Sequence, residues 1–232
     1  EPALDYVVTK IARFPFDKFA TAQNTLGTQM KATGEVMSVG RTLEESLLKA
    51  VRSLETGVCH IYHKKFDDWD TARLLEYIRT ATDDRLYAIA QLIRLGVDLG
   101  MVYNATKIDM FFLEKFKHIV EFEEVIRNNP NSVETIRDAK LLGISDKYIA
   151  QVWGCTEHDI YRMRAENNIF PVYKMIDTCA SEFSSYVPYF YSTYEAENES
   201  IVSDRKKIVV LGSGPIRIGQ GVEFDYSTVH AI

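Results

Sequence analysis

The middle of the chain, from about Glu55 to Ser200, repeats apolar residues three and four positions apart, and this constrains the fold more than any other feature. That period places apolar side chains on one face of an α-helix, whereas strands alternate every second residue. The spacing predicts helices over residues 69–81, 83–94, 106–129, 133–142, 146–153 and 157–167. No stretch here predicts a strand, so we expect an all-helical central domain.

Polar caps and glycines mark the ends of these predicted helices. The Ser145 and Thr156 hydroxyls are placed to accept backbone N–H groups at the start of the last two helices. Thr106, with Asp109 three residues later, predicts the start of the long helix. Gly143 and Gly154 follow two short helices, where the left-handed conformation that ends a helix favours glycine.

The residues on either side of this domain have a different apolar pattern. Residues 5–11 and 34–39 are rich in β-branched side chains or alternate polar with apolar ones, and they predict strands. Thr42 and Glu45 form a capping-box pattern that starts a helix reaching Gly57. Residues 208–211 form a short apolar run bounded by charge and glycine, which predicts a buried parallel strand. The fold class is therefore mainly α, with a central all-helical domain between short α/β pieces.

Composition excludes several classes of protein. The 33 acidic residues outnumber the 27 basic ones, and the net charge of −6 argues against a sequence-independent nucleic-acid surface or binding to acidic lipid. The chain has no apolar run of about 18 residues and no signal peptide at its start, so we expect a soluble, cytoplasmic protein. Three widely separated cysteines do not suggest a disulfide framework.

A glycine-rich turn follows the last predicted strand, over residues 212–221. Backbone N–H groups of such a turn can cradle phosphate. However, Arg217 stands where a dinucleotide fingerprint has glycine or alanine, and Gln220 and Gly221 stand where a P-loop has lysine and a hydroxyl residue. A phosphate site and a plain tight turn both remain open from these residues alone.

Three long motifs resemble one family. The run KIVVLGSGPIRIGQGVEFDYSTVHA, residues 207–231, resembles the opening of the second synthetase half of carbamoyl-phosphate synthetase large subunits. Residues 28–55 are similar to the end of the first half, and residues 171–199 to the connection that leaves the central helical region. Since the chain starts at Glu1 rather than methionine and stops shortly after a predicted strand, we expect a fragment of such a subunit.

The resemblance implies a division of the chain into three parts. Residues 1–55 would be the C-terminal end of the first, carboxyphosphate synthetic half, which has an ATP-grasp fold. Residues 56–199 would be the helical oligomerisation domain and connection. Residues 200–232 would begin the carbamoyl phosphate synthetic half.

The resemblance also implies an activity for the parent protein. That ligase makes carbamoyl phosphate from bicarbonate, glutamine-derived ammonia and two ATP, for arginine and pyrimidine biosynthesis. It uses ATP with magnesium or manganese, and potassium. By the family's layout the catalytic, nucleotide and metal residues lie outside this chain, so we expect no catalytic, cofactor-binding or metal site here and an inactive fragment.

The implied partners are the rest of the large subunit, a small glutaminase subunit and further copies bound through the helical domain. Apolar side chains there could belong to the core or to the interface, and for each one we expect the core: Phe111, Phe112, Tyr161 and Met163. By resemblance, three residues line the tunnel that carries carbamate between the two active sites: Glu35, Gly221 and Glu223.

The alternative from another class is a DNA-binding helix-turn-helix over residues 146–167. Charge argues against it, because three basic residues are opposed by four acidic ones: Lys147, Arg162 and Arg164 against Asp146, Glu157, Asp159 and Glu166.

Two cysteine-containing motifs are weaker candidates. Cys59, His60 and His63 are possible zinc ligands but have no second cysteine pair, and Cys179 has no base that the sequence can assign to it. We expect no metal ion and no nucleophile at these positions.

Overall fold

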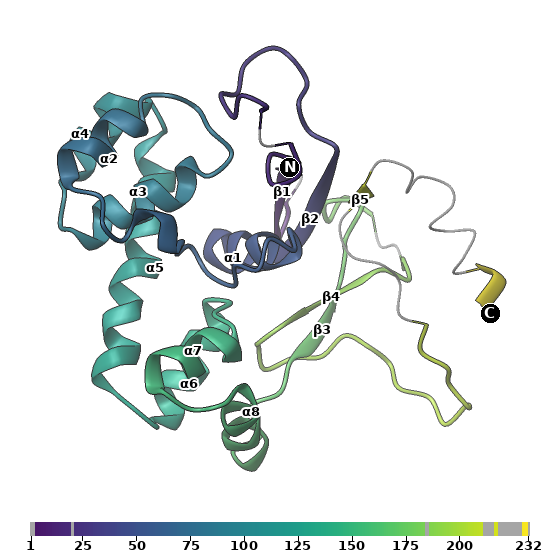
Figure 1. Ribbon diagram of the computed structural model, residues 1–232. Helices are drawn as coiled ribbons and strands as arrows, with labels where there is room; N and C mark the ends of the chain where they lie inside the picture. Colours follow the sequence, from purple (N-terminus) through teal and green to yellow (C-terminus); the bar gives the residue numbers. More distant parts are fainter. Residues whose placement is uncertain (1–2, 20, 184–185, 211–215, 218–228, 232) are drawn as a thin grey trace.

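A computed structural model of the chain describes residues 3–19, 21–183, 186–210, 216–217 and 229–231. Helices gather on one side and two small sheets on the other, with helix α1 (Leu43–Ser53) between them (Figure 1). Most of the described elements are helical, and the expected mainly α fold with short α/β pieces is confirmed.

The first sheet has strand order β1-β2-β5, formed by Val7–Arg13, Gly34–Gly40 and Ile216–Arg217. β1 and β2 are antiparallel, with Val7 opposite Gly40 and Arg13 opposite Gly34. β5 pairs antiparallel with the other edge of β2 and places Ile216 opposite Glu35. Helix α1 covers one face, where Val36 of β2 packs with Ala50 and Leu54.

The helical domain is built around its longest helix, α5. Its elements are η1 (Lys64–Phe66), α2 (Thr71–Tyr77), α3 (Arg85–Arg94), α4 (Leu99–Thr106), α5 (Met110–Asn128), α6 (Val133–Leu141), α7 (Asp146–Trp153) and α8 (Glu157–Glu166). α5 contacts α1, α3, α4, α6 and α7. In Figure 1, α5 runs from the upper group of helices to the lower group. Because it contacts helices of both groups, it fixes their relative positions.

One apolar core joins α1 to the helical domain. Leu48 of α1, Ile89 of α3 and Leu113 of α5 are almost completely inaccessible to solvent and belong to the same cluster. Full burial of one such side chain stabilises a protein by about 1.5 to 3 kcal/mol relative to exposure. α1 therefore packs on the sheet with one face and on the helical core with another.

Three of the four predicted helix caps form. Thr42, Ser145 and Thr156 each accept a backbone N–H at the start of α1, α7 and α8, and Thr156 completes a reciprocal capping box with Asp159. Gly154 ends α7 with a left-handed φ of 70°.

The prediction that Thr106 starts the long helix is wrong. Thr106 is the last residue of α4, and its Oγ1 donates to the Val102 carbonyl oxygen at 2.8 Å. Lys107 then takes a left-handed φ of 58°, and Asp109 caps α5 by accepting the Phe111 N–H at 2.9 Å. Two residues with capping side chains lie three apart, and the second of them caps the helix because the first bonds within the preceding turn.

The expectation of no strand between residues 55 and 200 is also wrong. β3 (Val172–Met175) and β4 (Phe190–Thr193) form a two-stranded antiparallel sheet. Lys174 occupies a buried position opposite Tyr191, which interrupts the apolar alternation that marks a strand in the sequence. The lysine is tolerated because its ammonium group lies 3.1 and 3.2 Å from two glutamate carboxylates, those of Glu197 and Glu199.

The predicted buried parallel strand at 208–211 is not found at residues 208–210. Ile208 is 91% exposed and Val209 is 81% exposed. A parallel strand is buried only when strands or helices cover it, and no described strand pairs with this stretch. Leu211 and most of the glycine-rich turn lie outside the described residues.

Candidate functional site: the junction around helix α1

Two adjacent glutamates in the first turn of α1 form the centre of a junction. Glu44 and Glu45 are each 1% exposed. The positive end of a helix dipole favours carboxylates at this position, although burial of a charge requires partners as well. The two side chains find those partners in different parts of the molecule.

Glu45 joins α1 to both sheets. Its Oε2 accepts the Arg41 N–H, just after β2, at 2.7 Å, and the Thr193 hydroxyl of β4 at 3.0 Å. Its Oε1 lies 2.7 Å from Lys49 Nζ, which also donates to the Val39 carbonyl oxygen at 2.9 Å. Since these contacts are short and shielded from water, they fix the start of α1 relative to both sheets.

Glu44 joins α1 to α5. Its Oε1 accepts from His118 Nδ1 at 2.7 Å and lies 3.2 Å from Lys115 Nζ. Burial acts to raise the pKa of Glu44, but the hydrogen bonds from His118 and Lys115 outweigh it and hold the pKa below its ordinary value. Glu44 therefore carries a negative charge at neutral pH, and that charge attracts α5.

A glycine allows the turn between α6 and α7 to sit directly on α1. Gly143 has a φ of 81°, and a Cβ added there would lie 2.7 Å from the Glu45 Cα atom. The Arg52 guanidinium, about two turns further along α1 than Glu45, donates to the Gly143 carbonyl oxygen at 2.7 Å. Only a residue without a side chain satisfies both the backbone conformation and this close approach.

A buried ionic cluster links α3, α5 and the segment before η1. Glu123 accepts from Arg94 Nε at 2.8 Å and Nη2 at 2.7 Å, and it lies 3.0 Å from His60 Nε2. Burial acts to raise the pKa of Glu123, but Arg94 and His60 lower it to about 2. Burial lowers the pKa of His60, whose ring stacks on Tyr148 at 3.8 Å. The cluster thus holds a charged glutamate and a neutral histidine.

A second buried cluster argues against DNA binding. Asp146 accepts from Arg164 Nη2 at 2.6 Å and from Lys140 Nζ at 2.8 Å, and all three side chains are buried. Arg164 is therefore unavailable to a phosphate, and in the predicted motif only Lys147 and Arg162 remain as exposed cations. The structure does not support the helix-turn-helix alternative.

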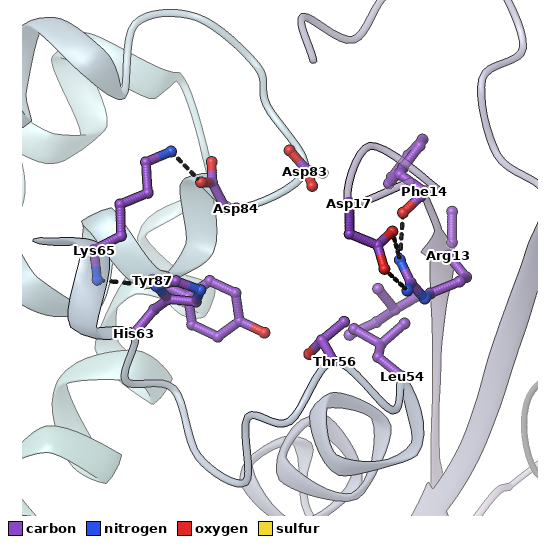
Figure 2. Close-up of a pocket in the computed structure, with 12 residues that line it drawn as sticks. Arg13, Phe14, Asp17, Leu54, Thr56, His63, Lys65, Asp83, Asp84 and Tyr87 are labelled. Atoms are coloured by element: carbon purple, nitrogen blue, oxygen red, sulfur yellow. Dashed lines mark hydrogen bonds and ion pairs between the residues drawn. The ribbon is translucent and has the colours of Figure 1, made fainter. Parts of the chain in front are cut away.

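A cavity of about 240 Å³ lies beside the junction, between the end of β1 and the loop before α3 (Figure 2). Its charged side chains are largely paired: Arg13 lies 2.9 Å from Asp17, and Lys65 lies 2.5 Å from Asp84. Burial raises the pKa of Tyr87 in its wall to about 12. The cavity thus lies where the first sheet meets the helical domain.

Of the three predicted tunnel residues, the structure describes one. Glu35 lies on β2, on the face of the sheet away from α1, and its carboxylate is 2.9 Å from Lys10 Nζ. Gly221 and Glu223 lie outside the described residues. The strand that precedes them in the sequence, β5, starts at Ile216, directly opposite Glu35.

The possible zinc ligands do not converge. His60 contacts Glu123, His63 Nδ1 accepts the Lys65 N–H at 3.1 Å, and Cys59 Sγ lies 3.8 Å from the Gln151 side chain. Across the part of the chain that the structure describes, no group of three or more His, Cys, Asp or Glu is arranged to hold a metal ion.

The expectation that each singled-out apolar residue belongs to the core is partly wrong. Phe111, Phe112 and Tyr161 are exposed, whereas Met163 packs against the core. Phe111 and Phe112 lie in the first turn of α5, shortly after the Asp109 cap. Exposed rings of this kind are candidates for an interface.

Sequence reasoning missed the junction itself. Glu45 was recognised only as part of a capping pattern, and nothing marked Glu44, Gly143 or Asp146 as residues that connect distant elements. The available signal was the pair of acids directly after the cap of an amphipathic helix, which is common on exposed helices too.

The described fold defines a helical docking module in which one helix, α1, is bound by ionic contacts to a strand piece on one side and a helical core on the other. Residues 35–168 match the family model of the carbamoyl-phosphate synthetase large chain, oligomerisation domain. Residues 204–232 match that of the carbamoyl phosphate synthase preATP-grasp domain. The chain belongs to the carbamoyl-phosphate synthetase large chain family. Among the described helices, none has the length and apolar character needed to cross a membrane.

Proposed function

We propose that this chain connects the two synthetase halves of a carbamoyl-phosphate synthetase large chain and forms part of the wall of its carbamate tunnel. The tunnel residues are Glu35 from the end of the first half, and Gly221 and Glu223 from the start of the second. The helical domain between them mediates self-association. The chemistry, which consumes bicarbonate, glutamine-derived ammonia and two ATP, takes place elsewhere in the parent protein.

The observation that carries the proposal is the pairing of β2 with β5. Glu35 lies opposite Ile216 although the whole helical domain separates them in sequence. Gly221 and Glu223 follow β5 within a few residues in the sequence. A passage between two active sites needs wall residues from both halves at one place, and the pairing of β2 with β5 supports such an arrangement.

The physical case for such a passage is the instability of carbamate. Carbamate decomposes quickly in water, and an enclosed, water-poor route protects a reactive intermediate from side reactions. A glycine in the wall leaves space for the intermediate, because it has no side chain.

The junction around α1 supports the connecting role. Glu45 bonds to Arg41 at the end of β2 and to Thr193 of β4, and Glu44 bonds to α5. These contacts attach the segment before the helical domain and the segment after it to the same helix. A rigid attachment of this kind would hold the two halves at a fixed separation.

The test uses the complete large chain with ammonia as nitrogen source. Gly221→Phe should abolish carbamoyl phosphate synthesis and preserve bicarbonate-dependent ATP hydrolysis, because the ring fills the passage and leaves the first active site intact. Gly27→Phe is the control, since an added Cβ at Gly27 meets no atom within 4 Å. Equal loss of both activities in Gly221→Phe would contradict the tunnel assignment.

The remaining parts of the proposal concern the parent protein. ATP, magnesium or manganese, and potassium bind in the rest of the large chain, a small glutaminase subunit supplies ammonia, and the enzyme serves arginine and pyrimidine biosynthesis in the cytoplasm. The isolated chain should therefore not hydrolyse ATP. An ATP-hydrolysing activity that stays with the purified chain through several chromatographic steps would contradict this part of the proposal.

A further inference from the structure

The face of the first sheet that points away from α1 carries a single ion pair among its described residues. Strand residues alternate between the two faces. Val7, Thr9 and Ile11 of β1 lie on the α1 side, where Thr9 Oγ1 contacts the Ser46 hydroxyl at 2.6 Å. Val8, Lys10 and Ala12 therefore share the opposite face with Glu35 and Met37 of β2.

Lys10 and Glu35 meet across this face. The strand register places Lys10 opposite Met37, and Glu35 opposite Ala12, so the two charged residues are diagonal neighbours. Lys10 Nζ lies 2.9 Å from Glu35 Oε2, and the side chains are 59% and 41% exposed. No other described basic residue forms an ion pair with Glu35.

The order of the strands determines the side from which Lys10 reaches Glu35. β2 is the middle strand, β1 with Lys10 lies along one edge, and β5 lies along the other. Lys10 thus approaches Glu35 from the side opposite to the strand that leads to Gly221 and Glu223. The lysine is therefore placed to neutralise the Glu35 carboxylate from the β1 side of the sheet.

We propose that Lys10 is a positioning residue of the carbamate passage, which holds the Glu35 carboxylate against β1 and cancels its charge. This inference rests on the proposed function of Glu35. Carbamate is an anion, so an unneutralised carboxylate in the wall would repel it. Lys10 both removes that repulsion and keeps the glutamate side chain on the sheet rather than in the passage.

If the ion pair between Lys10 and Glu35 were only structural, its loss should change the properties of the enzyme little. Ion pairs between half-exposed side chains contribute little to stability, so a variant at Lys10 should fold. The informative measurement is therefore the coupling ratio, which is carbamoyl phosphate formed per ATP hydrolysed in the complete large chain.

Lys10→Met should lower the coupling ratio by about fivefold, because Glu35 keeps its charge and loses its partner. Lys10→Arg should keep the ratio near that of the unmodified protein. The double variant Lys10→Met, Glu35→Gln should regain most of the ratio, since no unpaired carboxylate remains. Lys117→Met is the matched control, because Lys117 pairs with Glu121 on α5 at similar exposures of 51% and 62%.

Two outcomes would overturn the inference. An unchanged ratio in Lys10→Met, in an enzyme that Gly221→Phe uncouples, would remove Lys10 from the passage and leave the proposed function in place. Equal losses of ATP hydrolysis and product in Lys10→Met, with a lowered Tm, would assign the lysine to folding alone. Failure of Gly221→Phe itself to uncouple would instead contradict the tunnel.

Discussion

At the scale of single residues, Gly143 shows how much one position can decide. Other helix-ending glycines have a similar positive φ, but among the described ones Gly143 alone lies against the Glu45 backbone. Both the conformation and the contact disfavour a side chain, and both would be disturbed by the smallest one, a methyl group.

We therefore expect Gly143→Ala to lower the free energy of unfolding by about 2 to 4 kcal/mol, from the left-handed conformation and the clash together. Gly96 occupies the same position after α3, with a φ of 76° and no atom within 4 Å of an added Cβ. Gly96→Ala should cost only about 1 to 2 kcal/mol. Equal losses for the two variants in urea denaturation would show that the contact with α1 contributes nothing.

The buried pair His60 and Glu123 predicts an acid-sensitive core. Burial lowers the pKa of His60, so below its ordinary value of 6.5 the unfolded chain binds a proton that the folded chain does not. The pKa of Glu123 falls from 4.5 to about 2 on folding, so its contribution, about 3 kcal/mol, is present above pH 4.5 and lost between about 4.5 and 2.

Urea denaturation from pH 8 to pH 3 should accordingly show the free energy of unfolding falling in two stages. His60→Gln should flatten the first stage, between about pH 7 and 5, because glutamine can still donate to Glu123 and does not titrate. If the variant kept the same pH slope in that range, groups other than His60 would be responsible.

At the scale of elements, most short helices of the domain form where the sequence predicts them, although α4 (Leu99–Thr106) was not predicted. The contacts between the helices could not be predicted from the sequence. α8 has the length, cap and position of a recognition helix. Its two arginines differ completely: Arg164 is buried against Asp146, whereas Arg162 is exposed beside Asp159. The helix is thus a packing element that closes the lower end of the domain.

Arg164→Ala should lower the free energy of unfolding by about 3 to 5 kcal/mol, since Asp146 would lose its bidentate partner in the interior. Arg162→Ala, two residues earlier on the same helix, should cost at most about 1 kcal/mol. Thermal or chemical denaturation of both variants checks this, and similar small effects would mean that the buried cluster does not hold α6, α7 and α8 together.

At the scale of the whole molecule, the helical domain leaves apolar side chains unburied. Phe111 and Phe112 on α5, Tyr161 on α8 and Met101 on α4 are all about half exposed. Exposed aromatic and methionine side chains are enriched in protein interfaces. They fit a domain that binds further copies of itself.

Sedimentation of the chain over a wide range of concentrations should therefore show a mass that rises above the monomer value, with an apolar interface that resists added salt. A mass that stays monomeric at the highest concentrations would contradict a self-associating role for this segment. Dissociation by salt alone would point to a charged contact instead.

The sequence by itself determined the family and most of the local structure. Apolar spacing located most helices, and the caps at Thr42, Ser145 and Thr156 were readable because capping depends on residues three apart. It misplaced a helix start at Thr106 and missed β3 because Lys174 is a buried charge in a strand. Both errors come from side chains whose role depends on partners elsewhere.

Only the tertiary structure decided which charges are buried and what they connect. Glu44, Glu45, Asp146 and Arg164 look in the sequence like ordinary surface residues, yet each is enclosed by partners from other elements. The pairing of Glu35 with Ile216 is likewise a long-range fact. Local propensity depends on neighbours along the chain, whereas burial and charge pairing depend on how the elements pack, and that packing brings distant residues together.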